Sequence, residues 1–423
     1  MTFQGGTFMK LKGFALLFTI AFSLVIGQSV QSEKHNIYWM KIKAEDKFAR
    51  SRIVDMGINI EGISDQYVIA YGNDHDLNLI KKAGLLIASS DLDLENKFRS
   101  KDFPAEDAAY HNFSELTAVL EQISRENPDI VRLESVAKTI EGRDIWAVRL
   151  SAGSKAADEK PAVIYMGGHH AREHLSVEVP ILFLKHLVKE YRSNNSRIVS
   201  LLNNRDIHII PVVNPDGMEY DIKDGKYKMW RKNRSRNSDG TYGVDLNRNY
   251  GYQWGTGGSS SNPSSDTFKG PQAFSEIETQ AIKNYVERHQ NISILLSFHT
   301  YSELILYPWG HKYDGLEIVR DKQVHEAMAK KMAEWNRYTP KQSSGLYIAS
   351  GDTTDWSYGV HKIISFTFEL DPTNNGVGGG GFYPGAGIIQ SVFEKNLEPC
   401  LYLLEYADNP YRVINVGIGP IKP

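Results

Sequence analysis

The stretch that organises the chain is Gly-Gly-His-His-Ala-Arg-Glu, residues 167–173. It directly follows the apolar run 162–166 (AVIYM), which is typical of a buried strand, and precedes a helical pattern over residues 176–191. Strand, turn and helix in this order indicate an α/β domain. His170 and Glu173 form a His-x-x-Glu pair at the carboxyl end of the strand, where such sheets usually hold their ligands.

The His-x-x-Glu pair supplies one imidazole nitrogen and one carboxylate oxygen. Zinc prefers these ligands in hydrolytic sites that take a third ligand from elsewhere and keep one position open. With thirteen histidines in the chain, roughly one such spacing is expected by chance. Taken alone, the pair would be interpreted as a polar turn after a strand, so its meaning depends on the motifs downstream.

Composition narrows the class of protein. The chain of 423 residues is 41% hydrophobic and 23% charged, which is typical of a soluble globular protein with one large domain and a smaller one. Its formal net charge of −3 gives no electrostatic basis for binding nucleic acid. Cys400 is the only cysteine, which excludes an intramolecular disulfide and a cysteine-based zinc cluster.

The N-terminus predicts export. Lys10 and Lys12 precede an apolar run over residues 14–26 and then small and polar residues over 27–32. This pattern is typical of a secretory signal peptide, here residues 1–29, because the run is too short to span a bilayer. The alternative is an N-terminal membrane anchor. We expect a secreted protein, extracellular or periplasmic, without stable membrane association.

Residues 36–88 form a unit of their own. Strand-like and helical patterns alternate there in the order β-α-β-β-α-β, which predicts a small α+β, ferredoxin-like (split βαβ) domain. Residues 91–108 are charged and aperiodic, as expected of an exposed linker. Three basic residues make this linker a natural site of proteolytic cutting. They are Lys97, Arg99 and Lys101.

The rest of the chain alternates strands with long helices, which predicts an α/β domain with a mixed central sheet flanked by helices. Glycine-rich loops are expected at residues 255–265 and 374–381. Strand patterns cover residues 131–137, 145–150, 162–166, 206–213, 292–297 and 363–368, and helical patterns cover residues 112–126, 176–191, 275–288, 319–335 and 386–406.

Six further motifs accompany residues 167–173. They are NPDG (214–217), WRKNRS (230–235), GVDLNRN (243–249), SFHTYSELILYPWG (297–310), YIASGDTTDW (347–356) and SFTFEL (365–370). Together they resemble the zinc metallocarboxypeptidase family, of the carboxypeptidase A/B type with an N-terminal activation segment, in the family's order and spacing. The resemblance covers residues 35–407. It implies a zymogen with a signal peptide (1–29), an activation propeptide (30–102), a catalytic domain (103–410) and a C-terminal tail (411–423).

The resemblance also implies a metal site. His170, Glu173 and His299 match the ligands of one zinc ion per chain, with a water in the open position. Asp245 matches the carboxylate that orients the first histidine ligand. Without the family, His299 would be interpreted as a core histidine and Asp245 as a turn-forming residue.

By the same resemblance, Glu369 matches the general base that accepts the proton of the attacking water. It lies in an apolar run, residues 363–370, where a structural carboxylate would be costly unless paired. Arg234 matches the group that stabilises the oxyanion. The bond Asp371–Pro372 matches a cis peptide of the family.

Asn247, Arg248 and Tyr347 match the residues that bind the substrate's terminal carboxylate, for which the planar fork of arginine is well suited. Arg172 and Tyr301 match binding residues further along the peptide. For each arginine taken singly, a surface salt bridge is the alternative interpretation.

The specificity pocket departs from both the A and the B type. Thr354 stands where A-type enzymes have an apolar residue and B-type enzymes have Asp, and Asp352 stands two residues earlier. This pattern is similar to that of carboxypeptidase T, a bacterial member. We expect release of apolar and basic C-terminal residues; if Asp352 faces away or is neutralised locally, the pocket is purely apolar. The walls match Leu306, Gly310, Leu346, Ala349 and Thr367.

Two other classes compete with a carboxypeptidase. Zinc amidohydrolases and muropeptide endopeptidases share the metal site but have less use for Asn247, Arg248 and Tyr347. A non-catalytic peptide-binding protein on the same fold would be expected to lack Glu369. As partners we expect peptide or protein C-termini and a maturing protease, no nucleic acid, and a monomeric enzyme.

Overall fold

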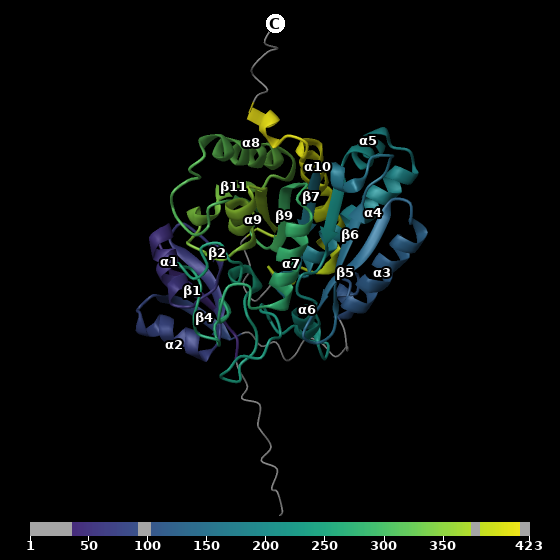
Figure 1. The fold of residues 1–423 in the computed structure, drawn as a ribbon. Coiled ribbons are helices and arrows are strands. Elements are labelled where there is room, and N and C mark those ends of the chain that lie inside the picture. The colour runs from purple at the N-terminus through teal and green to yellow at the C-terminus, as the bar shows by residue number, and fades with distance from the viewer. Residues whose placement is uncertain (1–35, 92–102, 374–380, 415–423) are drawn as a thin grey trace, which may run out of the picture. The chain divides into compact units, whose positions relative to one another are not determined.

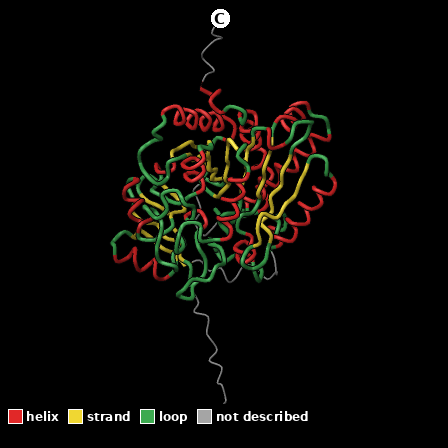
Figure 2. The backbone as a smooth tube through the Cα atoms, viewed as in Figure 1, coloured by secondary structure: helices red, strands yellow, loops and turns green. Residues whose placement is uncertain are grey.

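The computed structural model describes residues 36–91, 103–373 and 381–414 (Figure 1). The predicted signal peptide, the linker residues Lys97, Arg99 and Lys101, and most of the loop 374–381 lie outside this part. Within it are a four-stranded and an eight-stranded sheet, drawn with their helices in Figure 2.

The small sheet belongs to the N-terminal unit, and its order is β2-β3-β1-β4 with antiparallel pairing. This confirms the predicted ferredoxin-like order of elements. Its core includes Met40, Ile42, Val68 and Ile80. The elements are β1 (Tyr38–Lys43), α1 (Lys47–Asp55), β2 (Ile60–Ile63), β3 (Tyr67–Gly72), α2 (Asp74–Lys82) and β4 (Leu86–Asp91).

The large sheet has the order β11-β10-β12-β9-β7-β8-β6-β5. Its middle strands, β12, β9, β7 and β8, are parallel to one another, whereas β10 and β6 pair with them in the antiparallel sense. The sheet is therefore mixed, as predicted. Its strands are β5 (Val131–Lys138), β6 (Asp144–Leu150), β7 (Ala162–Met166), β8 (Asp206–Ile210), β9 (Ile292–Thr300), β10 (Leu304–Tyr307), β11 (Thr339–Gln342) and β12 (Ile364–Leu370).

Strand β7 shows why the middle of the sheet is continuously apolar. Val163 and Tyr165 belong to one hydrophobic core, and Ile164 and Met166 belong to the other. Successive side chains of a strand point to opposite faces, so a strand covered on both faces needs apolar residues throughout. The sequence 162–166 satisfies this requirement.

Helices cover both faces of the large sheet. Residues of α3 (Phe113–Glu126), α4 (Leu175–Arg192), α5 (Ser196–Asn204), α8 (Val319–Asn336) and α10 (Ile389–Tyr406) contribute to one core. Residues of α7 (Ile277–Arg288) and α9 (Thr353–His361) contribute to the other. The short helix α6 (Pro215–Ile222) begins at Asn214, whose side chain accepts a hydrogen bond from Gly217 N, so the NPDG motif is a helix start.

Some elements were not predicted: α5, α6, α9, β10 and β11. Strand β11 contains Pro340 and lies at the edge of the sheet, where proline is tolerated but the usual strand signal is missing. The predicted exposed linker, residues 91–108, extends too far along the chain, because Phe103 and Asp107 are buried. The many charges between residues 91 and 108 concealed this anchored segment. As predicted, the bond Asp371–Pro372 is cis.

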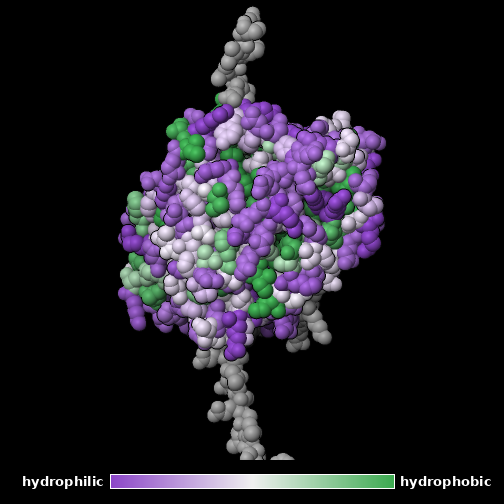
Figure 3. All heavy atoms as spheres, in the orientation of Figure 1, coloured by the Kyte–Doolittle hydropathy of each residue, from purple (hydrophilic) through white to green (hydrophobic). Residues whose placement is uncertain are grey.

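The face of the molecule in Figure 3 is mainly hydrophilic, with scattered apolar side chains. None of the helices in the described ranges combines the length and the apolar character needed to cross a membrane.

Candidate functional site

The candidate site lies where the parallel strands of the large sheet end. Gly167 and Gly168 turn the chain out of β7, and a side chain at Gly167 would collide with Ser176 O, 2.2 Å from the position of its Cβ. Gly168 has a φ of 59°, which favours glycine. This tight turn brings residues 169–173 over the ends of β7 and β9.

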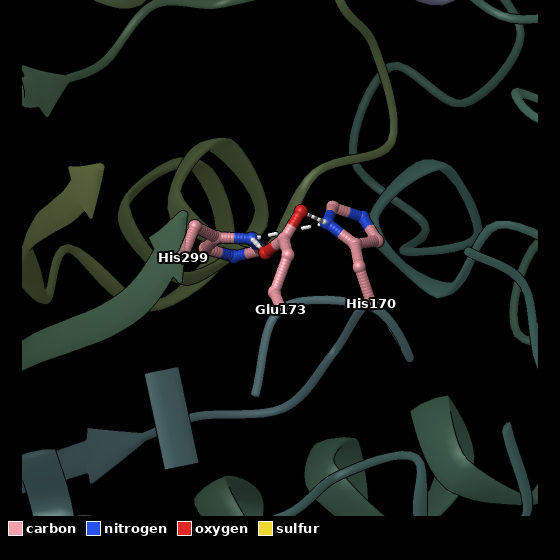
Figure 4. Close-up of side chains that lie close together, drawn as sticks. All are labelled: His170, Glu173 and His299. Atoms are coloured by element: carbon pink, nitrogen blue, oxygen red, sulfur yellow. Dashed lines mark hydrogen bonds and ion pairs between the residues drawn. The ribbon is translucent and has the colours of Figure 1, made fainter. Parts of the chain in front are cut away.

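The side chains of His170, Glu173 and His299 converge there (Figure 4). His170 Nδ1 lies 2.8 Å from Glu173 Oε1, and His299 Nδ1 lies 3.0 Å from Glu173 Oε2. All three residues are buried, and one ligand atom from each lies within 4.8 Å of the other two. Two imidazole nitrogens and one carboxylate oxygen at this spacing fit zinc, whose bonds to them are about 2.0–2.2 Å long.

Each histidine is held through its second ring nitrogen. His170 Nε2 lies 3.1 Å from Asp245 Oδ1, and His299 Nε2 lies 3.1 Å from Ser297 Oγ. A metal-binding histidine commonly donates this N–H to a fixed partner, which sets its tautomer and ring orientation. The donor set therefore has the outer support that a metal site needs.

The carboxylates of this cluster are held in the charged form. Burial opposes ionisation of Glu173, but the charges of His170 and His299 outweigh it and keep its pKa below the ordinary value. Burial acts in the same sense on Asp245, and Arg231 and His170 keep the pKa of Asp245 well below its usual range. Both side chains can thus bind a cation or accept N–H bonds at neutral pH.

Glu369 of β12 lines the same pocket as His170 and Glu173. The strand register places it beside His299 of β9 on one side and Leu304 of β10 on the other. Burial raises the pKa of Glu369 well above its ordinary value, and the charges of Glu173 and Glu61 add to the effect. A buried carboxyl group with a raised pKa beside a metal site is a candidate for proton transfer.

Arg234, predicted to face the reacting group, does not line the pocket. Its guanidinium lies over the rings of Tyr220 and Trp230, at 3.6 and 4.9 Å from their centroids. Arg231, three residues earlier, lines the pocket instead, with Nη1 3.8 Å from Glu173 Oε1 and Nη2 3.0 Å from Asp245 Oδ2. The catalytic role of Arg234 therefore stays a prediction, and the structure adds Arg231 as a second arginine of WRKNRS that lines the pocket.

Three predicted carboxylate-binding residues, Asn247, Arg248 and Tyr347, line the pocket together. The guanidinium of Arg248 is positioned by two backbone carbonyls, since Nε donates to Gly258 O at 3.0 Å and Nη1 donates to Asn247 O at 2.9 Å. Asn247 and Arg248 follow directly after Asp245 in a 3-10 turn, Leu246–Arg248. These two pocket residues and Asp245, the partner of His170, thus come from one short segment.

Asp352 lies at the far end of the pocket, which Leu306, Leu346, Ala349 and Thr354 also line. Its Oδ1 accepts hydrogen bonds from Thr354 Oγ1 at 2.7 Å and from Asp355 N at 2.8 Å. Burial, together with the charge of Asp355, raises the pKa of Asp352 to about 7. Asp352 and Thr367 are both among the residues that line the pocket.

Arg172 is buried beside the pocket, and Tyr301 lines it. Arg172 forms an ion pair with Glu61 of β2, and its Nη1 lies 3.1 Å from Asp266 Oδ2. Glu61 lines the pocket together with its neighbours Asn59, Ile60 and Ile63. The N-terminal unit therefore occupies space directly at the candidate site.

The sequence analysis missed several residues at the site. Arg231 and Ser297 lie inside motifs that were recognised, so their positions in those motifs were the available signal. Glu61 gave no sequence signal, because a single Glu in a strand of another unit does not indicate a functional site. The fully buried His169 was passed over because it stands next to a stronger candidate, His170.

Comparison with known proteins agrees with this geometry. The zinc carboxypeptidase family model matches residues 116–399. The chain is 36% identical to a zinc carboxypeptidase of Saccharothrix mutabilis subsp. capreolus, over 88% of this chain and 90% of that protein. It is 32% identical to carboxypeptidase B of Astacus astacus, over 63% of this chain and 88% of that protein. The crystal structure of carboxypeptidase A from Helicoverpa armigera superposes with a TM-score of 0.72 at 25% identity, covering 89% of this chain and 98% of that one.

Proposed function

Because the chain belongs to the zinc carboxypeptidase family, we propose that it releases single amino acids from peptide C-termini, using zinc held by His170, Glu173 and His299. The observation that carries the proposal is the convergence of these three ligands beside a pocket that Asn247, Arg248 and Glu369 also line. A metal site alone would serve many hydrolases. A metal site next to a carboxylate anchor suits an exopeptidase.

Zinc in this position would polarise the scissile carbonyl and lower the pKa of a water molecule. Glu369 is the proposed general base, which accepts the proton of that water and passes it to the leaving amine. Its burial and the charge of the nearby Glu173 raise its pKa above the ordinary value, which favours uptake of a proton from the water. Asp245 would keep His170 in its binding orientation through the contact to Nε2.

Arg231 is the proposed oxyanion-stabilising group, in place of Arg234. Its guanidinium lines the pocket close to Glu173 and is held by Asp245, so its position is fixed before the substrate arrives. Fixed positive charge stabilises the negative charge that develops on a carbonyl oxygen during attack.

The terminal carboxylate of the substrate is the group that Arg248 suits best, with Asn247 and Tyr347 beside it. The side chain of the released residue would then enter the space toward Leu306, Leu346 and Asp352. Apolar side chains gain from burial against such walls at roughly 25 cal/mol per Å². A Lys or Arg side chain could follow the same walls and bring its charge to Asp352.

The proposed precursor contains residues 30–102 as a propeptide, followed by the catalytic domain, residues 103–410. Strand β2 supports the propeptide assignment, because its Glu61 pairs with Arg172 and lines the pocket. A peptide substrate would need the space that this strand takes up. Cutting the linker after Lys97, Arg99 or Lys101 would release the unit, and Phe103 and Asp107 would remain anchored in the catalytic domain.

Export of the precursor, with removal of residues 1–29, is proposed from the sequence pattern of Lys10, Lys12 and the apolar run 14–26.

The decisive test compares blocked dipeptides that carry either a free C-terminal carboxylate or a C-terminal amide. Before limited trypsin treatment the chain should cleave either series only slowly, and after treatment it should cleave only the free-carboxylate series. A chelator should abolish hydrolysis, and added zinc should restore it. Equal cleavage of the amidated series would overturn the carboxypeptidase assignment in favour of a general zinc amidohydrolase.

A further inference from the structure

A third histidine lies between the metal site and the carboxylate anchor. His169 is fully buried (0% exposed) in the loop after β7. Its ring stacks on that of His299, with the centroids 5.5 Å apart and the planes 22° from parallel. None of the roles proposed above uses this residue, although its ring contacts that of His299.

One ring nitrogen of His169 faces the metal ligands. Its Nδ1 lies 3.4 Å from Ser297 Oγ, and the same oxygen lies 3.1 Å from His299 Nε2. Ser297 and His299 belong to the same strand, two residues apart, so their side chains point to the same face. Ser297 therefore connects the two imidazole rings.

The other ring nitrogen faces the carboxylate anchor. His169 Nε2 lies 3.2 Å from Thr353 Oγ1 and 3.0 Å from Tyr250 Oη. Thr353 Oγ1 donates to Asn247 Oδ1 at 2.9 Å, and Thr353 N donates to the same oxygen at 2.9 Å. With Oδ1 engaged twice, the amide Nδ2 of Asn247 is the group that remains to bind a substrate.

The donors and acceptors follow one direction when His299 binds a metal through Nδ1. His299 Nε2–H donates to Ser297, and the Ser297 hydroxyl donates to His169 Nδ1. The neutral ring of His169 then carries its proton on Nε2 and donates to Thr353, whose hydroxyl donates to Asn247. Each hydroxyl accepts once and donates once, which is within the capacity of these groups.

We propose that His169 is a positioning residue that couples the metal ligand His299 to Asn247, the anchor of the substrate's terminal carboxylate. The proposal rests on the proposed function above and adds a physical link between the metal site and the site that binds the substrate's terminal carboxylate. One buried ring sets the orientation of both groups, so the distance between His299 and Asn247 is held constant. Tyr250, which also contacts Nε2, gives the ring a second fixed point.

Two substitutions of His169 test the two halves of this series of hydrogen bonds, the Ser297 half and the Thr353 half, separately. In His169→Asn the amide can replace Nδ1 but cannot reach Thr353, and in His169→Gln the amide can replace Nε2 but loses Ser297. His169→Gln should weaken zinc binding, measured by chelator competition on the full chain, by about tenfold, as for other outer partners of metal ligands. His169→Asn should keep the zinc affinity and raise KM for blocked dipeptides by about the same factor.

The control is His208→Asn, which changes another fully buried histidine. His208 lies on β8, with Nδ1 2.7 Å from Tyr285 Oη and Nε2 2.9 Å from Asp206 Oδ2. This variant should lower Tm without changing zinc affinity or KM. If the two His169 variants behave in the same way, or shift zinc affinity and KM together, the coupling role is refuted.

A second pair of variants covers the case in which His169 variants do not fold. Ser297→Ala should weaken zinc binding, and Thr353→Val should raise KM, whereas Thr353→Ser should restore it. An unchanged zinc affinity in Ser297→Ala would overturn the proposal. Absence of carboxypeptidase activity in the wild-type chain would count against the proposed function instead, and the zinc titrations would still report on the Ser297 half.

Discussion

The two ends of the pocket are built in different ways. At the metal end, partners come from distant segments: Asp245 holds His170 and Arg231, and His299 reaches Glu173 from another strand. At the far end, Asp352 is held by its own neighbours, because its Oδ1 accepts from Thr354 and Asp355 at the start of α9.

Under the proposed function, this difference is expected to separate catalysis from specificity. A change at the metal end disturbs a network of buried charges and should lower the hydrolysis of every substrate by the same factor. A change at the far end disturbs a local helix cap and should alter the ratio between substrates. The structure thus allows specificity to vary while the catalytic geometry is kept.

The largest effect is expected for Glu369→Gln. Loss of the proposed base should lower kcat by about 10²–10⁴-fold, equally for substrates ending in Leu and in Arg. Zinc content, measured by elemental analysis, should stay at one per chain, whereas His299→Ala should lose zinc and activity together. Turnover near that of the wild type would remove Glu369 from the mechanism.

The second effect distinguishes the two arginines of WRKNRS. Arg231→Gln should lower kcat by about 10²–10³-fold for all substrates, the usual loss for a group that stabilises an oxyanion. Arg234→Gln should leave kcat within about threefold and lose only the stabilisation of its guanidinium on Tyr220, of order 0.5–1 kcal/mol. Steady-state kinetics and thermal melts of the two variants measure these losses. A larger loss of kcat in Arg234→Gln than in Arg231→Gln would make Arg234 the oxyanion-stabilising group.

The third effect belongs to the far end. Asp352→Asn should lower kcat/KM for a substrate ending in Arg by about tenfold relative to Leu, as expected for loss of one charge-assisted contact. Because the pKa of Asp352 is raised to about 7, its carboxylate is ionised only above that pH. In the wild type, the preference for Arg over Leu should therefore rise as the pH increases through about 7.

The same pKa shift predicts a change in stability. A carboxyl group with a raised folded-state pKa favours folding fully below its unfolded pKa of about 3.9, and loses this contribution as the pH rises through about 7. Asp352→Asn should therefore reduce the decline in Tm over this range. An Arg-to-Leu ratio that is independent of pH and unchanged in the variant would show that Asp352 does not select the substrate.

The smallest effect concerns the N-terminal unit, which reaches the pocket through Glu61. Glu61→Gln should weaken the contact with Arg172 and raise the residual kcat/KM of the uncut chain by a few-fold, since the amide still accepts a hydrogen bond and only about 1 kcal/mol, the difference between a charged and a neutral hydrogen bond, is lost. After the linker is cut, the variant and the wild type should have equal activity. A difference that persists after cutting would mean that Glu61 does not act through the precursor.

Much of the fold was predictable because its signals are local. The strand 162–166 and the small N-terminal domain follow from apolar periodicity, which is a property of neighbouring residues. Elements without that signal, such as β11 with Pro340, were missed. The buried segment around Phe103 was also missed. Its many charged neighbours predicted an exposed linker, and a single aromatic residue did not change that prediction.

The candidate site was predictable where spacing along the chain sets geometry. His170 and Glu173 lie three residues apart, whereas Glu369 lies within the apolar strand β12 and its role was implied by the family resemblance. The choice between Arg231 and Arg234 was not predictable, since both lie in an irregular segment and only the packing of Trp230 and Asp245 around them orients each guanidinium.

By itself, the sequence determined the class of fold, the order of most of its elements and the pair of residues that starts the metal site. Only the tertiary structure decided which arginine faces the pocket, that Glu61 reaches Arg172, and that His169 lies between Ser297 and Thr353. The physical reason is the distance along the chain over which each kind of interaction acts. Periodicity and turn chemistry act over a few residues, whereas the partners of a buried polar group are chosen by contacts between segments that the chain brings together only when it folds.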